Sequence, residues 1–199
     1  MKITRLTIQK NNNERVNIFL DGIYCLSLTK DQILDNKLFV NKEIDEPELE
    51  LLKRSSNEGL VKAKTIEWLF IRPRSARELS LYLLKKKIDP ELSQKIISEM
   101  QNKKYQNDQQ FCEWWVDQRL AKNMSLTKIK SELFSKGINR TVVEQVINNK
   151  NINESKNMAL FIQSKRLTQK YPDKLKLKKY LFSKGYSYDV INEYFTQQN

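Results

Sequence analysis

The sequence of 199 residues contains no histidine. This absence removes the most common general base and the most common metal ligand, so histidine-dependent catalytic triads are excluded. The two cysteines, Cys25 and Cys112, stand far apart and form no Cys-x-x-Cys pair. A structural zinc site is therefore not expected, and isolated thiols fit a reducing compartment better than a disulfide scaffold. We expect neither a metal nor a cofactor.

Glycine, proline and long apolar runs are also scarce. The chain has four glycines and four prolines, with neither a GxxxxGK[ST] loop nor a GxGxxG turn, so nucleotide hydrolysis has no support. No apolar run approaches the roughly 18–20 residues that span a membrane. The N-terminus also lacks the apolar segment of a signal peptide. We expect no membrane association and a cytoplasmic location.

Positive charge is present in excess. The chain carries 36 Lys and Arg against 24 Asp and Glu, a net charge of +12. Residues 1–60 hold slightly more acidic than basic side chains, so the excess lies in residues 61–199. This balance favours nucleic acid or acidic protein surfaces as partners and does not bear on the fold. An AT-rich genome would also produce a lysine-rich and asparagine-rich chain, and this stays an alternative explanation.

The N-terminal region has the alternation of β-strands. Apolar and polar side chains alternate on both sides of Asp21 and Gly22. This dipeptide is a strong hairpin signal, because a type I′ turn needs positive φ at both central residues. A third strand is predicted at 3–8, with a turn over 10–13. We expect a small sheet within residues 1–28.

Helical spacing follows this sheet. Thr29 and Gln32 have the spacing of a capping box, which predicts a short helix. A second helix is predicted to start after Asp45, where acidic residues suit the positive end of the helix dipole. The stretch 55–59 contains two serines and a glycine and predicts a break before the rest of the chain.

The sequence Leu-Phe-Ser-Lys-Gly occurs twice, at 133–137 and at 181–185, with a degenerate copy at 83–87. Self-similarity at such a period is typical of tandem supersecondary units, which must stack to build a core. Each unit is expected to open with a helix, at about 62–71, 108–122 and 154–169. The predicted caps of the second helices are Ser75, Ser125 and Asp173, and those of the third helices are Asp89, Asn139 and Ser187.

Core positions and helix ends agree among the three copies. Ser75 and Glu78 have the spacing of a full capping box. Gly137 and Gly185 are expected to close the second helix in the left-handed conformation, whereas Lys87 replaces glycine in the first copy and predicts a different closure. The second-helix core positions are predicted at Leu79, Ile129 and Leu177, then at Leu83, Leu133 and Leu181.

We therefore predict a mainly α-helical protein, an elongated tandem array of three three-helix repeats. The repeats are expected at 61–105, 106–150 and 151–199. They follow an N-terminal region, 1–60, that contains a small β-hairpin or sheet and short helices.

Three stretches of the chain match elements of one protein family. The first is Arg72-Pro73-Arg74-Ser75 followed by Glu78 and Leu79, the second Tyr105, Asp108, Phe111, Val116 and Arg119, and the third Ile129, Leu133, Lys136, Gly137 and Ile138. On these residues the chain resembles the RecX family, regulatory proteins of the RecA recombinase, over essentially its full length. It departs from the family pattern at Lys104, where glycine is usual, at Asn107, where an acid is usual, and at Cys112, where alanine is usual.

The resemblance implies a non-enzymatic regulator with no catalytic residue. It also implies that the chain lies in the groove of the RecA–DNA filament, bridges protomers and modulates the recombinase, its ATPase and its coprotease activity. The partner expected for this chain is the RecA filament, with single- or double-stranded DNA reached through a basic face. The expected effect is inhibition of RecA in DNA recombination, DNA repair and the SOS response. The chain is expected to act as a monomer.

Basic side chains recur beside the second helix of the repeats, which predicts a basic stripe, although a solvated helix face is the alternative. Of the tryptophans, Trp68 and Trp115 are expected in packing and Trp114 in contact with a partner. Asp108 is predicted to cap its own helix. The residues expected to contact RecA or DNA are Arg72, Arg74, Arg77, Trp114, Arg119, Lys128, Lys130, Lys136, Lys174, Lys176, Lys178 and Lys179.

Two other functions stay open on the sequence alone. The first alternative is a general single-stranded nucleic-acid-binding helical module that acts without a recombinase. The second is a metal-dependent nuclease, which would need a carboxylate cluster around Asp108 that only folding could assemble.

Overall fold

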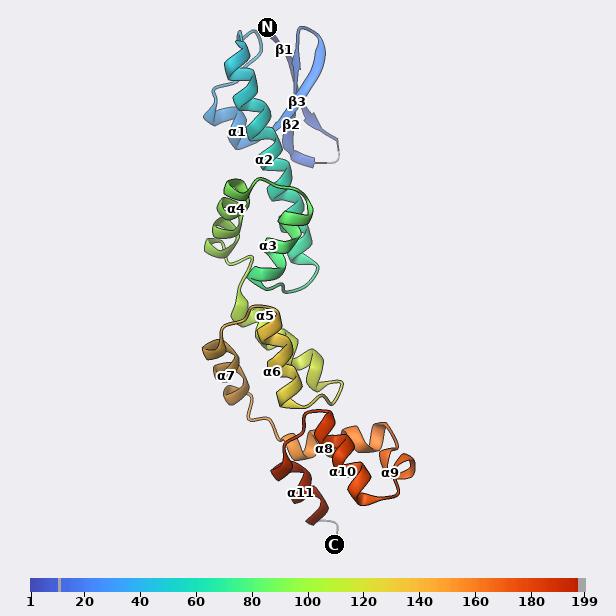
Figure 1. The fold of residues 1–199 in the computed structure, drawn as a ribbon. Helices are drawn as coiled ribbons and strands as arrows, with labels where there is room; N and C mark the ends of the chain where they lie inside the picture. The colour runs from blue at the N-terminus through green and yellow to red at the C-terminus, as the bar shows by residue number, and fades with distance from the viewer. Residues whose placement is uncertain (11, 197–199) are drawn as a thin grey trace. The chain divides into compact units, whose positions relative to one another are not determined.

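The computed structural model describes residues 1–10 and 12–196 and divides the chain into two compact units, residues 1–70 and 71–199. The described residues are mainly helical, with one small sheet near the N-terminus (Figure 1). Among them, no helix is both long enough and apolar enough to cross a membrane. This confirms the predicted fold class, a helical protein preceded by a small sheet.

The first unit is built on an antiparallel sheet of three strands in the order β1-β2-β3. Asp21 and Gly22 join the last two strands with φ of 48° and 86°, which confirms the predicted two-residue turn. The turn predicted over 10–13 is shorter, because Asn12 and Asn13 already belong to β2, and Asn11 lies outside the described residues. The strands are β1 (Ile3–Gln9), β2 (Asn12–Leu20) and β3 (Ile23–Thr29).

Two helices complete this unit, α1 (Lys30–Asp35) and α2 (Glu46–Phe70). Thr29 and Gln32 form the predicted capping box, with Thr29 Oγ1 accepting from Gln32 N at 3.2 Å and Gln32 Oε1 accepting from Thr29 N at 2.9 Å. Asp45 Oδ1 accepts from Glu48 N at 2.8 Å at the predicted start of α2. The apolar sides of the sheet and of α2 form one core.

The break predicted at 55–59 was wrong, because α2 runs through it without interruption. Small side chains stand there because the sheet and α1 approach closely. Ser56 Oγ donates to the carbonyl of Ser27 at 2.6 Å, and a Cβ on Gly59 would lie 3.2 Å from Nη1 of the buried Arg15. Serine and glycine therefore mark close packing in this helix. The opening helix expected at about 62–71 is the C-terminal part of α2.

The second unit consists of helices whose caps lie where the sequence predicts them. Ser75, Ser125 and Asp173 cap the second helices, and Asp89 and Asn139 cap the third helices of the first two repeats. The helices are α3 (Ala76–Lys85), α4 (Pro90–Asn102), α5 (Asp108–Leu120), α6 (Leu126–Ser135), α7 (Arg140–Asn149), α8 (Glu154–Ser164), α9 (Leu167–Lys170), α10 (Lys174–Ser183) and α11 (Tyr188–Thr196).

The predicted core positions of the second helices are at most 2% exposed. Those of the second and third repeats belong to separate cores, with Phe111 and Tyr186 among the largest buried side chains. One helix prediction was wrong. The helix expected at about 154–169 is divided into α8 and α9, because Arg166 takes a left-handed φ of 49° between them.

The described part of the second unit contains two junctions between successive repeats, and both use the same hydrogen bonds. At the first junction, Ser75 Oγ donates to the carbonyl of Lys136 at 2.9 Å. At the second junction, Ser125 Oγ donates to the carbonyl of Lys184 at 2.7 Å. Each buried hydroxyl also accepts an amide bond from its own helix as N-cap. Serine suits this position because a hydroxyl donates and accepts at once.

A carboxylate from the next repeat completes each junction. Asp108 Oδ1 accepts from the amide of Ala76, and Glu154 Oε1 accepts from the amide of Leu126, both at 2.8 Å. Asp108 thus caps α3, whereas Asn107 caps α5. The prediction that Asp108 caps its own helix was therefore wrong, because its carboxylate serves the preceding repeat.

The glycine of the repeated pentapeptide lies against the preceding repeat. Gly137 and Gly185 have φ of 79° and 90°, as predicted. A Cβ on Gly137 would lie 3.1 Å from Arg77 Cβ, and one on Gly185 would lie 2.7 Å from Ser125 Oγ. Lys87 also takes a left-handed φ, 56°, so the first copy closes in the same conformation and the prediction of a different closure was wrong.

Candidate interaction surface

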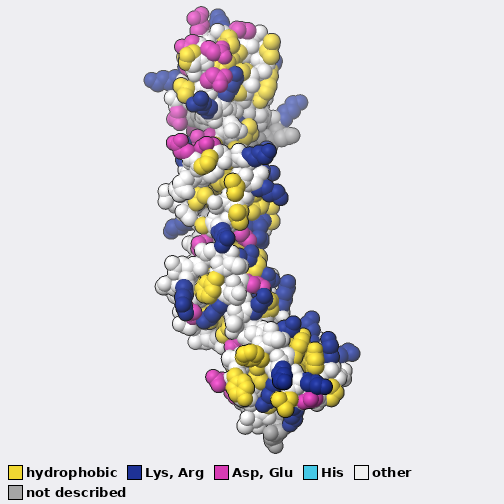
Figure 2. Space-filling model, viewed as in Figure 1, with side chains coloured by type: hydrophobic (Ala, Val, Ile, Leu, Met, Phe, Trp, Pro, Cys, Tyr) yellow, Lys and Arg dark blue, Asp and Glu magenta, His cyan; other side chains and the backbone are white. Residues whose placement is uncertain are grey.

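The residues predicted to contact a partner all lie in the second unit. In the view of Figure 2, acidic side chains gather on the first unit, and Lys and Arg side chains are spread over the second. The structure separates the predicted residues into two groups. One group is held by the chain's own carboxylates, carbonyls and aromatic rings, and the other group is exposed.

A cluster of charged and aromatic side chains lies at the first junction, and we call it the junction cluster. Its centre is Glu78 on α3, which accepts two bonds from the guanidinium of Arg72, at 3.0 and 3.2 Å. Lys136, from the next repeat, donates to the same carboxylate at 2.9 Å. The members of the junction cluster are Arg72, Glu78, Trp114, Trp115, Arg119, Glu132 and Lys136.

Trp115 forms the aromatic part of the junction cluster. The guanidinium carbon of Arg119 lies 4.0 Å from its ring centroid, and Nζ of Lys136 lies 4.2 Å from it. Trp115 Nε1 donates to Glu132 at 3.1 Å, and Arg119 Nε donates to the same carboxylate oxygen at 2.6 Å. Both cations are therefore fixed by a carboxylate and a ring together.

Trp114, the other tryptophan of the junction cluster, is half-buried. Its ring centroid lies 6.0 Å from that of Phe111 and 5.9 Å from that of Trp115. The guanidinium of Arg72 lies 5.2 Å from its ring. The ring of Trp114 therefore packs within the chain, and its contact with a partner stays a prediction.

Glu78 is ionised in this arrangement. Burial alone would raise its pKa, but hydrogen bonds and charge from Arg72 and Lys136 outweigh burial and hold the pKa below the ordinary value of 4.5. A lowered carboxyl pKa contributes stability that is complete above the ordinary value and is lost as the pH falls through the lowered value. The first junction is therefore expected to weaken in acid.

Replacing Glu78 with glutamine should remove this acid-dependent stability, because Arg72 and Lys136 lose their shared anion. The difference in unfolding free energy between Glu78→Gln and wild type is expected to be largest above about pH 5 and to shrink below pH 4.5. Urea denaturation between pH 3 and pH 7, with exposed Glu91→Gln as control, measures it. A difference independent of pH would show that Glu78 is not an ionised part of the junction.

Other predicted residues are also engaged within the chain. Lys130 donates to Glu144 at 2.7 and 3.0 Å, and Lys178 donates to Asn192 at 2.9 Å, so the same two positions pair in both repeats. Arg77 Nη1 donates to the carbonyl of Ser135 at 3.1 Å across the first junction. Arg74 is half-buried, and burial, with the neighbouring charge of Arg72, lowers its pKa.

The remaining predicted cations are exposed: Lys128 on α6 and Lys174, Lys176 and Lys179 on α10. Arg77 is exposed as well, although its guanidinium is bonded. These residues are the part of the predicted stripe that an external anion can reach.

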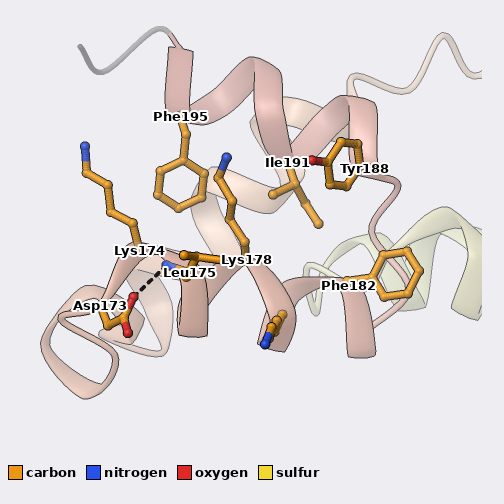
Figure 3. A pocket seen from close by; sticks show the side chains of 9 residues that line it. Asp173, Lys174, Leu175, Lys178, Phe182, Tyr188, Ile191 and Phe195 are labelled. Atoms are coloured by element: carbon orange, nitrogen blue, oxygen red, sulfur yellow. Dashed lines mark hydrogen bonds between the residues drawn. The ribbon is translucent and has the colours of Figure 1, made fainter.

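An apolar groove of about 720 Å³ lies between α10 and α11 (Figure 3). Ile191 and Phe195 are its buried part, and Leu175, Phe182 and Tyr188 line it while remaining 64–67% exposed. The lysines that line it are Lys174, Lys178 and Lys179. The groove thus combines exposed apolar surface with positive charge, a combination suited to a protein segment that carries both apolar and acidic side chains.

The described residues hold no group of three or more His, Cys, Asp or Glu side chains that could bind a metal. Asp108 is engaged in capping α3. Burial raises the pKa of the Cys112 thiol to about 11, so this thiol is neutral at pH 7.

Sequence reasoning missed the exposed apolar residue of the pentapeptide and the partners across the junctions. Leu84, Phe134 and Phe182 occupy the same position in the three copies and are 69%, 41% and 64% exposed. The identity of the two pentapeptides contained this signal, because a recurring apolar residue next to a core leucine cannot face the same core. The amides that cross the junctions, from Gln106 and Asn157, left no such signal.

Family models match two parts of the chain. The model of the regulatory protein RecX N-terminal domain matches residues 1–45, and the model of the RecX second three-helix domain matches residues 107–147.

Among curated proteins, the chain is similar to regulatory proteins RecX from several bacteria. That of Clostridium beijerinckii is 30% identical over 199 residues, covering 96% of this chain and 93% of the relative. That of Bacillus pumilus is 31% identical, covering 96% and 75%. That of Oceanobacillus iheyensis is 30% identical, covering 100% and 77%.

Two solved structures have a similar fold. A crystal structure of regulatory protein RecX has a TM-score of 0.79 at 18% identity and covers 98% of each chain. The structure of RecX from Lactobacillus salivarius has a TM-score of 0.61 at 21% identity, covering 70% of this chain and 95% of that one.

Proposed function

This chain belongs to the RecX family of regulatory proteins, and we propose that it binds the filament that the RecA recombinase forms on DNA and inhibits the recombinase. It would act without catalysis, as a cytoplasmic monomer, in recombination, DNA repair and the SOS response. The binding surface is proposed to be the exposed basic face of the repeats, lying in the filament groove and bridging protomers.

The observation that carries this proposal is the exposure of lysines on second helices of successive repeats. Lys128 on α6 and Lys176 on α10 occupy equivalent positions and are both exposed. A filament repeats one subunit along its length, so a chain of repeats can meet several subunits with equivalent side chains. The junction bonds fix neighbouring repeats to each other, and this limits the entropy that binding would cost.

The second support is the apolar groove between α10 and α11. The filament protomers are proteins and can supply a segment for this groove. The apolar side chains of the groove can bind the apolar part of such a segment, and the lysines can attract its acidic side chains. The exposed lysines and the apolar groove can both act by binding alone. In this proposal the fixed members of the junction cluster are structural, and the exposed lysines make the contact.

The test compares binding to pre-formed RecA filaments with binding to bare single-stranded DNA at matched salt. The proposal expects filament affinity at least tenfold above affinity for bare DNA, because protein contacts add to phosphate contacts. Fluorescence anisotropy of the labelled protein measures both. Equal affinities would instead support the alternative, a general single-stranded nucleic-acid-binding module that needs no recombinase.

A further inference from the structure

The two junctions carry opposite charge at one equivalent position. Glu78 and Lys128 occupy the same place in their helices, since each donates its amide to the N-cap serine of the junction. Lys136 and Lys184 are also equivalent, since the carbonyl of each accepts from that serine. The first junction therefore pairs an acidic residue, Glu78, with Lys136. At the equivalent positions the second junction has two basic residues, Lys128 and Lys184.

The second junction also contains a cavity. Lys128, Lys184 and Phe161 line a space of about 260 Å³. Both lysines are exposed, and within the described part of the chain neither forms an ion pair. Nζ of Lys184 lies 4.9 Å from the ring centroid of Tyr180, so a ring is close to this ammonium but no carboxylate binds it. The acidic side chain that reaches this junction is Glu154, and its carboxylate is bound by the amide of Leu126.

We infer that the second junction binds a phosphate group between Lys128 and Lys184, where the Glu78 carboxylate lies in the first junction. The first junction shows the arrangement with an internal anion, since Glu78 accepts from Lys136 at 2.9 Å and from Arg72 at 3.0 Å. The second junction keeps the cation and lacks that carboxylate. An external anion supplies the missing negative charge.

The size and lining of the cavity indicate a phosphate carried on a nucleic acid. Sites for whole small molecules measure about 300–1,000 Å³, so this cavity suits a single group. A phosphate offers several oxygens, which two ammonium groups can bind at once with charge-assisted hydrogen bonds. Phe161, half-buried against Tyr186 with ring centroids 5.8 Å apart, provides an aromatic surface for the attached sugar or base.

The inference rests on the proposed function only for the source of the phosphate, which would be the DNA of the filament. Inorganic phosphate tests the site without RecA and without DNA. A single-stranded oligonucleotide tests the second source of the same group. The site and the proposed function can therefore fail separately.

Replacing Lys128 with glutamate rebuilds the charge arrangement of the first junction. The new carboxylate can pair with Lys184 and follows Ser125 at capping-box spacing near the positive end of α6. Lys128→Glu should therefore raise the melting temperature by about 2 °C. It should also abolish the effect of phosphate, which is expected to raise the melting temperature of wild type by about 1–2 °C above chloride at equal ionic strength.

The oligonucleotide provides the second readout. Lys128→Glu should weaken oligonucleotide binding about tenfold at low salt, and exposed Lys165→Glu, with the same change in charge, should weaken it less than about threefold. Lys128→Gln, which keeps the helix without a new carboxylate, should lose the phosphate effect with no gain in melting temperature. Equal phosphate stabilisation of wild type and Lys128→Glu would overturn the inference. Stabilisation by poly-glutamate but not by phosphate would overturn it in favour of an acidic protein partner.

Discussion

Gly185→Ala is expected to lower the free energy of unfolding by about 3 kcal/mol, the largest loss expected among the Gly→Ala changes compared below. The φ of 90° at Gly185 costs any other residue about 1 kcal/mol or more. The added Cβ would also lie 2.7 Å from Ser125 Oγ, which forces a shift costing about 1–3 kcal/mol. That hydroxyl is buried and holds the carbonyl of Lys184.

Replacing two other glycines with alanine measures the conformational cost and the steric cost separately. Gly22 has a φ of 86°, and a Cβ added there would contact no neighbouring atom within 4 Å, so Gly22→Ala should cost only the conformational part, about 1 kcal/mol. Gly137→Ala should lie between them, because its Cβ would meet Arg77 Cβ and Cδ at 3.1 Å. Urea denaturation gives the three values. Equal losses for Gly185→Ala and Gly22→Ala would contradict the close approach at the second junction.

A double variant tests the same contact from its other side. Ser125→Ala alone should destabilise by about 1–2 kcal/mol, since it removes an N-cap and leaves the carbonyl of Lys184 without this donor. In Gly185→Ala, the same change also removes the atom that the new Cβ meets. The combined loss should therefore be smaller than the sum of the single losses.

Replacing Lys128, Lys176 and Lys179 with glutamate is expected to weaken filament binding about 100-fold or more without lowering stability. All three side chains are exposed, and reversing surface cations at a charged interface mainly removes electrostatic attraction. Lys128 and Lys176 stand in the first turns of α6 and α10, and neither turn contains an acidic residue. Glutamate there suits the helix dipole, so the melting temperature should stay equal or rise.

The matched control is the replacement of Lys2, Lys30 and Lys64, which are exposed in the first unit, with glutamate. It changes the net charge equally and should weaken binding less than about threefold at physiological salt, where distant charges are screened. Titration into labelled filaments, with thermal unfolding of each variant, measures both effects. Equal weakening by the two triple variants would mean that net charge alone, and no particular face, governs binding.

Arginines before α3 are less suitable for such a test. Arg72 is bound to Glu78 by two hydrogen bonds and lies beside Trp114. A glutamate at that position would face the Glu78 carboxylate, and the first junction would weaken. Loss of binding in that variant would then report on folding as well as on the surface.

Local features of the fold could be predicted from the sequence. Helix caps such as Ser75, Ser125 and Asp173 bond within three residues of themselves, so their signal lies in adjacent sequence. The core leucines follow from helical spacing, and the Asp21-Gly22 turn follows from its φ requirement. The break predicted at 55–59 was wrong because serine and glycine are typical both of a helix break and of a close approach between elements. Only the fold places Arg15 against Gly59.

Partners distant in sequence could not be predicted in this way. Asp108 caps a helix that begins 32 residues earlier, and no spacing rule connects the two. Lys128 and Lys130 stand two residues apart on α6, yet Lys130 is bound to Glu144 and Lys128 is exposed. The sequence located the basic helices, and the three-dimensional packing decides which of their cations are accessible.

The most direct test of the proposed function is titration of the protein into RecA filaments on single-stranded DNA, following ATP hydrolysis and filament length together. Binding along the filament by the exposed face of the repeats predicts that hydrolysis falls with added protein, while the Lys128, Lys176 and Lys179 triple variant leaves hydrolysis and length unchanged. Hydrolysis and filament length that stay constant at saturating wild-type protein would contradict it.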